Sequence, residues 1–116
     1  MNGICHVEIP SKDYEKAKKF YSEVFGWECN DMPEMKYVTY KPQDGPGGGF
    51  DKSLEITSKP GITIYIEVED IGAAIKKAEN AGGKCMKEKT QISPDYGYYA
   101  FISDLEGNRI GLWGKK

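Results

Sequence analysis

The sequence predicts an α+β fold built from two copies of one module, in which a strand and a helix are followed by several strands. The main observation is an internal repeat: residues 6–29 reappear in step at residues 63–86. The offset between matching positions, 63 − 6, 70 − 13 and 83 − 26, is 57 in each case, close to half of the 116 residues. A repeat of this period indicates a duplicated supersecondary unit. We therefore expect module one at about 1–58 and module two at about 59–116.

The first module opens with a strand. Ile4–Ile9 alternates between two faces, and Ser11 or Asp13 can cap the helix that follows. That helix carries apolar residues at helical spacing and ends at Gly26. Lys36–Tyr40 is the next clear strand, and the glycine-rich stretch after it matches no nucleotide-binding fingerprint. A flexible loop or a close approach of two backbones is expected there.

The second module repeats this order. Ile62–Val68 alternates as a strand, and Asp70 caps a helix that ends before Gly82. The remaining predicted elements are strands over 84–90, 96–103 and 109–113, with a tight turn at 104–108 in which Gly107 can adopt positive φ.

Strand parity separates two sheet faces. The aliphatic side chains should meet the helices: Val7, Ile9, Ile64, Ile66, Val68, Ile110 and Leu112. The opposite, concave face should carry His6, Glu8, Thr63, Tyr65, Glu67, Arg109, Gly111 and Trp113. Such a face can simply be solvated, but two aromatic residues beside an imidazole favour a groove that holds a ligand.

Composition excludes several classes of protein. The formal net charge of −2 gives no basic surface for nucleic acid, and no apolar run reaches the roughly 20 residues of a membrane span. Three cysteines (Cys5, Cys29, Cys85) suggest free thiols and a cytoplasmic protein, with Cys5 facing the helices. One histidine excludes any site that needs two imidazoles from one chain.

Three motifs in order resemble the vicinal oxygen chelate superfamily, which includes glyoxalase I, bleomycin-resistance proteins and extradiol dioxygenases. They are His6-Val7-Glu8-Ile9-Pro10 with the helix ending in Val24-Phe25-Gly26-Trp27, then Glu67-Val68-Glu69-Asp70-Ile71, and Asp104-Leu105-Glu106-Gly107-Asn108. The resemblance spans nearly the whole chain. It implies paired βαβββ modules whose sheets form an open, curved half-barrel around a small-molecule groove, with helices outside.

The resemblance also implies a divalent metal held by one ligand from each of four strands. His6 matches the first position, but Thr63 and Gly111 stand where a histidine and a glutamate are expected. The fourth position falls near Gly47–Phe50, which offers no obvious ligand. Threonine and glycine cannot replace imidazole and carboxylate as strong ligands, so we expect no metal cofactor. A weak site from His6, Glu8 and Glu67 stays open as an alternative.

Three functions therefore compete. The chain is a metal-independent glyoxalase-like protein with an unassigned small substrate, a binding protein without turnover, or a metal-dependent lyase or isomerase with an unusual ligand set. His6, Glu8 and Glu67 are candidate catalytic groups, and Thr63, Tyr65, Arg109 and Trp113 are candidate ligand contacts. A homodimer is expected, because short domains of this kind leave strand edges and apolar surface to cover.

Overall fold

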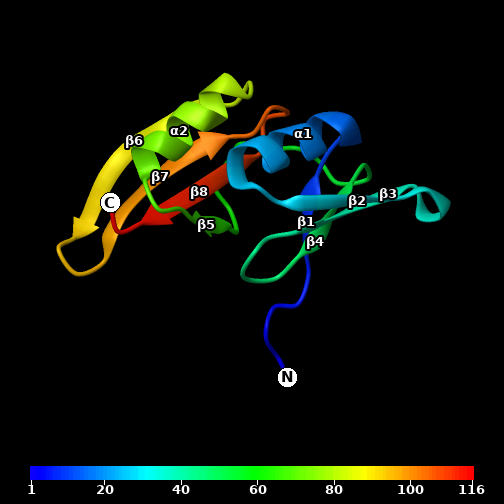
Figure 1. Ribbon diagram of the computed structural model, residues 1–116, viewed down its shortest axis with the longest axis horizontal. Coiled ribbons are helices and arrows are strands. Elements are labelled where there is room, and N and C mark those ends of the chain that lie inside the picture. The colour runs from blue at the N-terminus through cyan, green and yellow to red at the C-terminus, as the bar shows by residue number, and fades with distance from the viewer. The chain divides into compact units, whose positions relative to one another are not determined.

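Each half of the chain folds as a strand, a helix and three further strands (Figure 1). The computed structural model describes residues 1–116, which separate into unit one, residues 1–56, and unit two, residues 57–116. Unit one contains β1 (Val7–Pro10), α1 (Tyr14–Phe25), β2 (Glu28–Met32), the short 3-10 helix η1 (Pro33–Met35), β3 (Tyr37–Lys41) and β4 (Gly48–Asp51). Unit two contains β5 (Tyr65–Glu67), α2 (Ile71–Asn80), β6 (Lys84–Ser93), β7 (Gly97–Ser103) and β8 (Arg109–Gly114). The predicted α+β class with two βαβββ modules is confirmed.

The two sheets share one topology. Strand order is β1-β4-β3-β2 in unit one and β5-β8-β7-β6 in unit two. In each unit the first and last strands are parallel neighbours, and all other pairs are antiparallel. The register sets Glu8 opposite Gly49, and Tyr65 opposite Gly111. Figure 1 shows α2 lying along one face of its own sheet, which leaves the other face uncovered by that helix.

The predicted helix signals act as expected. Asp13, not Ser11, is the cap of α1, and its carboxylate accepts hydrogen bonds from the backbone N–H groups of Glu15 and Lys16. Gly26 ends the helix at φ 70°, a conformation that glycine adopts without a side-chain clash. Asp70 caps α2 by accepting from Ala73 N at 3.0 Å.

Unit one has an aromatic core and unit two an aliphatic one. The Trp27 ring stacks on Tyr40 at 4.5 Å and on Tyr21 at 4.9 Å between centroids. In unit two, the side chains sealed between α2 and the sheet are small or aliphatic: Ile71, Ala74, Ala78, Ala100, Ile102, Ile110 and Leu112. The aromatic residues of the first helix therefore fill the core of unit one, with Phe20 and Tyr21 almost fully buried.

The first strands are shorter than predicted. Strand β1 starts at Val7 because its parallel partner begins only at Gly48, so residues 1–6 have no strand beside them. Figure 1 shows this N-terminal segment leading away from the sheet of unit one. Cys5 is exposed there, and the prediction that it faces the helices is wrong.

In unit two, β5 keeps only Tyr65–Glu67 of the predicted Ile62–Val68. This strand pairs on one side only, with three residues of β8. Ile64, Ile66 and Val68 are consequently half-buried, whereas Ile110 and Leu112 in the interior strand are fully buried as predicted. In unit two, the interior strand β8 therefore fulfils the parity rule more completely than the edge strand β5.

The glycine-rich stretch runs into strand β4, so close backbone approach is the correct alternative there. A Cβ placed on Gly48 would collide with the carbonyl oxygen of Val7 in the neighbouring strand. The parallel pairing of β1 with β4 therefore requires a residue without a side chain at this position.

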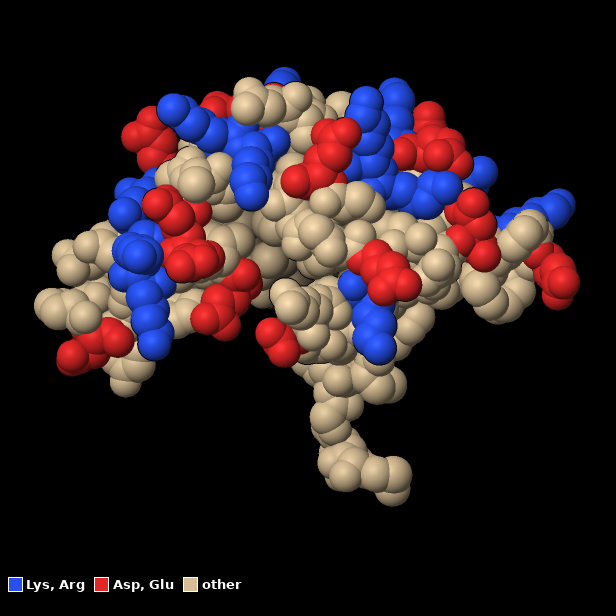
Figure 2. All heavy atoms as spheres, in the orientation of Figure 1, with Lys and Arg blue, Asp and Glu red and all other residues tan.

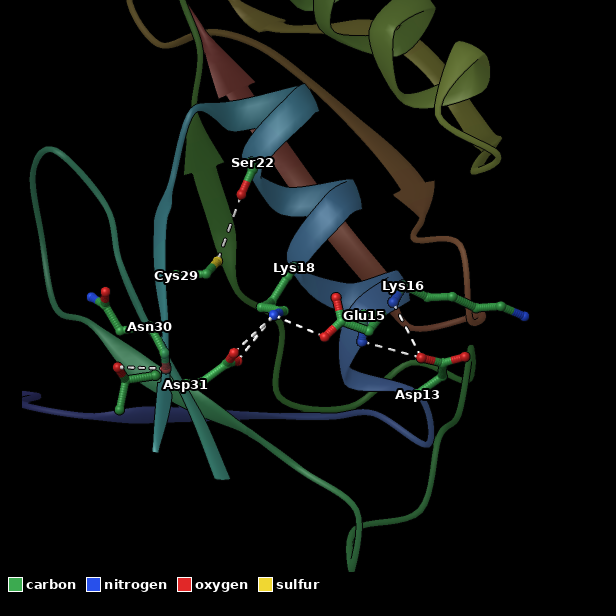
Figure 3. Close-up of polar contacts among 9 residues, drawn as sticks. Asp13, Glu15, Lys16, Lys18, Ser22, Cys29, Asn30 and Asp31 are labelled. Atoms are coloured by element: carbon green, nitrogen blue, oxygen red, sulfur yellow. Dashed lines mark hydrogen bonds and ion pairs between the residues drawn. The ribbon is translucent and has the colours of Figure 1, made fainter. Parts of the chain in front are cut away.

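Polar contacts fasten α1 to the edge strand β2 (Figure 3). Lys18 Nζ lies 2.9 Å from both Glu15 Oε1 and Asp31 Oδ1, and hydrogen bonds to these two carboxylates raise the pKa of the ammonium group. One turn further along the helix, the Ser22 hydroxyl donates to Cys29 Sγ at 3.8 Å. Burial raises the pKa of the Cys29 thiol, which therefore stays protonated near neutral pH.

The turn between β7 and β8 depends on Asp104, which is 5% exposed. Its Oδ1 accepts from the backbone N–H groups of Glu106, Gly107 and Asn108, each at 2.9 Å, and Gly107 adopts φ 110°. We expect Asp104→Ala to lower the free energy of unfolding by about 2–3 kcal/mol, because it leaves buried donors without their charged acceptor. Urea unfolding followed by circular dichroism measures this loss.

Asp95→Ala is the matched control for that experiment. Asp95 lies in the exposed turn before β7, and its removal should change the unfolding free energy by less than about 0.5 kcal/mol. Equal effects of the two substitutions would show that Asp104 does not hold the turn.

Candidate functional site

The side chains assigned by parity to one sheet face divide between the two units. His6 and Glu8 belong to unit one, and Thr63, Tyr65, Glu67, Arg109 and Trp113 belong to unit two. Residues that pair directly across neighbouring strands point to the same face of a sheet. The pairs Tyr65 with Gly111 and Glu67 with Trp113 therefore share the face of unit two that is opposite α2.

In unit one, His6 and Glu8 meet around a third residue, Tyr37. The Tyr37 hydroxyl donates to Glu8 Oε2 at 2.8 Å, and His6 Nε2 lies 2.9 Å from the same hydroxyl oxygen. His6 Nε2 is also 3.5 Å from Glu8 Oε2. The three side chains form one hydrogen-bonded cluster on the face opposite α1.

Sequence reasoning missed Tyr37. The signal was present, since Tyr37 alternates in β3 with Val38 and Tyr40, whose side chains are buried on the other face. Burial and the hydrogen bond to Glu8 raise the pKa of the Tyr37 hydroxyl. This group therefore keeps its proton near neutral pH and acts as a hydrogen-bond donor to the carboxylate.

In unit two, Arg109 is held by two neighbours. Its Nη1 donates to Thr63 Oγ1 at 2.9 Å, and the guanidinium carbon lies 3.7 Å from the centre of the Phe101 ring. Stacking on an aromatic ring and a hydrogen bond at the edge fix the plane of the guanidinium group. A fixed, half-buried cation of this kind is suited to bind a carboxylate or another anion.

A separate concavity of about 380 Å³ lies on the same face of unit two. It is lined by Tyr65, Ile92, Tyr99 and Trp113, and the Trp113 Nε1 donates to the carbonyl oxygen of Tyr96 at 2.8 Å. The structure thus brings the predicted contacts Tyr65 and Trp113 together. Ile92 was missed because β6 extends to Ser93, beyond the predicted end of this strand at residue 90.

Arg109 does not line this concavity. It stands four residues from Trp113 in β8, which corresponds to about 13 Å along the strand. The Tyr65 and Phe101 rings lie between the two positions, with their centroids 5.9 Å apart. A molecule that contacts both Trp113 and Arg109 must therefore be elongated and must cross this pair of aromatic rings.

Glycine in the last strand of each unit is covered by a tyrosine ring. The Tyr65 ring lies over Gly111, so close that a Cβ on this glycine would be 2.6 Å from Tyr65 Cδ2. The Tyr37 ring covers Gly49 in the same way, and a Cβ there would overlap the ring and its hydroxyl. Gly49 and Gly111 are equivalent positions, because each is paired with the matching residue of the parallel first strand.

These contacts test whether the chain could hold the divalent ion that the resemblance implies. Gly49 and Gly111 offer no donor side chain, and tyrosine rings occupy the space where one would project. Thr63 accepts a hydrogen bond from the cationic Arg109. Nowhere in residues 1–116 are three or more His, Cys, Asp or Glu side chains grouped so as to hold a metal ion. The residues present do not fit the ion.

Comparison with known proteins identifies the class of protein that this fold defines. Residues 3–112 match the family model of the Glyoxalase/Bleomycin resistance protein/Dioxygenase superfamily. The chain belongs to this superfamily, and the resemblance found in the sequence is confirmed.

Individual relatives agree with this assignment. The chain is 35% identical over 112 residues to a glyoxylase-like domain-containing protein of Didymella fabae, covering 90% of this chain and 88% of that protein. It is similar to fosfomycin resistance protein FosX from Listeria monocytogenes with a TM-score of 0.80 and 13% identity, covering 100% of this chain and 93% of that one. It spans only 43% of the length of two mycobacterial relatives, to which it is 29% identical.

The surface charges and the helices bear on the expectations about nucleic acid and membranes. On the face shown in Figure 2, Lys and Arg side chains are intermingled with Asp and Glu, and neither sign dominates a large area. Neither α1 nor α2 has the length and apolar character of a helix that spans a membrane.

The contact between Tyr65 and Gly111 predicts that Gly111→Ala destabilises the wild-type protein but stabilises a Tyr65→Ala variant. Gly111→Ala should lower the unfolding free energy by about 1 kcal/mol, because the new methyl group displaces the Tyr65 ring. In a Tyr65→Ala background the same substitution should raise it by about 0.5 kcal/mol, because alanine loses less entropy in a strand than glycine. Urea unfolding of the four variants gives the coupling.

Gly61→Ala serves as the control, since a Cβ at Gly61 would have no atom within 4 Å. Its effect should be the same with and without Tyr65. Additive effects of Gly111→Ala and Tyr65→Ala would contradict the packing of the Tyr65 ring on Gly111.

Proposed function

We propose that this superfamily member binds a small, elongated molecule along the open face of unit two, with an apolar or aromatic end in the concavity and an anionic end at Arg109. The observation that carries the proposal is the arrangement of Arg109: Thr63 and Phe101 hold its guanidinium group on the same sheet face as Tyr65 and Trp113. Relatives named lactoylglutathione lyase act on small molecules, which supports this class of ligand.

The aromatic side chains supply contact area at this site. Tyr65, Tyr99 and Trp113 present ring surfaces to the concavity, and Ile92 adds an aliphatic wall. Tyr65 is 50% exposed, so a ligand that covers it removes substantial apolar surface from water. Arg109 adds directional recognition of a carboxylate through its paired N–H groups.

We also propose that binding requires no divalent ion. In metal-using relatives the ion would supply positive charge to an oxygen of the substrate. In this chain the fixed positive charge next to Thr63 is a guanidinium group, and a metal would be repelled by it. The two acidic residues among the candidate catalytic groups, Glu8 and Glu67, belong to different units. Each stays a candidate proton acceptor.

Binding can be tested with 4-phenylbutyrate, which joins a phenyl ring to a carboxylate through a flexible chain. It should change the fluorescence of Trp113, and Trp113→Phe should abolish this signal. Trp27→Phe should leave the signal intact, since Trp27 is buried between Tyr21 and Tyr40 in unit one. Tyr65→Ala should weaken binding about tenfold or more.

A neutral probe separates the contribution of the Arg109 charge from that of the aromatic contacts. Arg109→Met should weaken 4-phenylbutyrate about tenfold but leave 4-phenylbutan-1-ol almost unaffected, because only the acid carries a charge. Benzoate should bind less tightly than 4-phenylbutyrate, because it is too short to bridge the two ends of the site. Binding that is untouched by Tyr65→Ala, Arg109→Met and Trp113→Phe alike would overturn the proposal.

The metal prediction is checked by elemental analysis of protein purified without chelators. We expect less than about 0.1 equivalent of zinc, nickel, manganese or iron per chain, because Gly49 and Gly111 in the last strands offer no ligand side chain. Close to one equivalent of metal, lost on His6→Ala, would show that the chain uses an unusual ligand set.

A further inference from the structure

Two aromatic rings on the open face of unit two each lie next to a cation of the chain. The guanidinium carbon of Arg109 is 3.7 Å from the centre of the Phe101 ring. Lys87 Nζ is 5.6 Å from the centre of the Tyr99 ring. Both contacts are cation–π interactions, in which the negative face of a ring attracts a positive charge. Aromatic rings on this face therefore serve as partners for positive charge.

The other two rings of the concavity, Tyr65 and Trp113, have no cation of the chain over them. Together with Tyr99 they supply three aromatic walls, and Ile92 supplies an aliphatic one. The hydrogen bond from Trp113 Nε1 to the carbonyl oxygen of Tyr96 restrains the indole ring. Several aromatic rings around one concavity are the arrangement by which proteins recognise quaternary ammonium groups.

A carboxylate lies at the same end of the site. Glu67 pairs directly with Trp113 across β5 and β8, so the two side chains share the open face. Glu67 is exposed and makes no hydrogen bond or ion pair within the chain. Nearer the other end, Lys87 is the cross-strand neighbour of Phe101, over which Arg109 lies. The open face therefore carries negative charge beside Trp113 and positive charge beside Phe101.

We propose that the ligand of this site is a zwitterion, which places an alkylated ammonium group in the aromatic concavity next to Glu67 and its anionic group at Arg109. The inference rests on the proposed function and names the chemical class of its ligand. Opposite charges at the two ends of the site select one orientation of such a ligand, because the reversed orientation brings like charges together. Glu67 is then the charge partner of the ammonium group, and the rings supply contact area and cation–π attraction.

An isosteric pair of compounds isolates the positive charge. 4-(Trimethylammonio)butanoate and 5,5-dimethylhexanoate have the same shape, chain length and carboxylate, and differ only in the charged nitrogen that replaces a quaternary carbon. In the wild type, a ligand-observed NMR titration should show the trimethylammonio compound binding about tenfold more tightly. Burial of apolar surface alone would give the opposite order, because the neutral compound is the more hydrophobic of the two.

Substitutions separate the contributions of Glu67 and of the rings. Glu67→Gln should weaken the trimethylammonio compound about threefold to fivefold and leave 5,5-dimethylhexanoate almost unaffected, because only the first carries a positive charge. The matched control is Glu79→Gln, which removes the same charge from α2 on the other face of the sheet and should affect neither compound. Both glutamates are exposed, so both variants should fold. Trp113→Leu should weaken the trimethylammonio compound more than its isostere, because leucine keeps apolar contact but removes the ring.

The outcomes distinguish this inference from the proposed function. If 5,5-dimethylhexanoate binds as tightly as the trimethylammonio compound while Arg109→Met weakens both, the zwitterion is wrong and the proposed site stands. Equal effects of Glu67→Gln and Glu79→Gln on the trimethylammonio compound would likewise overturn the inference alone. If neither compound binds, or if Arg109→Met weakens neither, the site itself is wrong and the inference falls with it.

Discussion

The parallel pairing between the first and last strand of each unit is the constraint on which the rest of the structure depends. A parallel pair cannot be closed by a tight turn, so the chain must cross over the sheet through a helix and return through the remaining strands. The same pairing fixes register, which places Glu8 opposite Gly49 and Tyr65 opposite Gly111. A slip by one residue would exchange the buried and open faces of the strand.

The register also explains why glycine occupies two equivalent positions, Gly49 and Gly111. Each glycine leaves a gap in the sheet surface, and a tyrosine from another strand covers it. The covering residues differ, since Tyr37 comes from β3 and Tyr65 from β5. The duplicated fold has thus arrived at the same packing twice with rings from different strands, and in both units the ring takes the place of a potential ligand.

The two units differ in where they keep their aromatic residues. Unit one buries Phe20, Tyr21, Trp27, Tyr40 and Phe50 beneath α1 and presents a small polar cluster on its other face. Unit two packs α2 with alanine and aliphatic residues and presents its aromatic rings on the open face. The same module therefore presents a small polar cluster in one copy and an apolar, cationic surface in the other.

The sequence alone determined the class of fold, the Asp70 cap of α2, the turn at Asp104 and the shared face of Tyr65, Gly111 and Trp113. These features follow from local rules: side chains alternate along a strand, Asp and Gly mark helix ends, and a sequence repeat indicates a duplicated unit. Tertiary structure alone decided the length of β1, which extends only as far as its partner β4, and it also limited β5 to three residues. It also decided the role of Tyr37 and the place of Ile92 in the concavity. Those depend on which side chains meet across strands distant in sequence, and no local pattern encodes such a meeting.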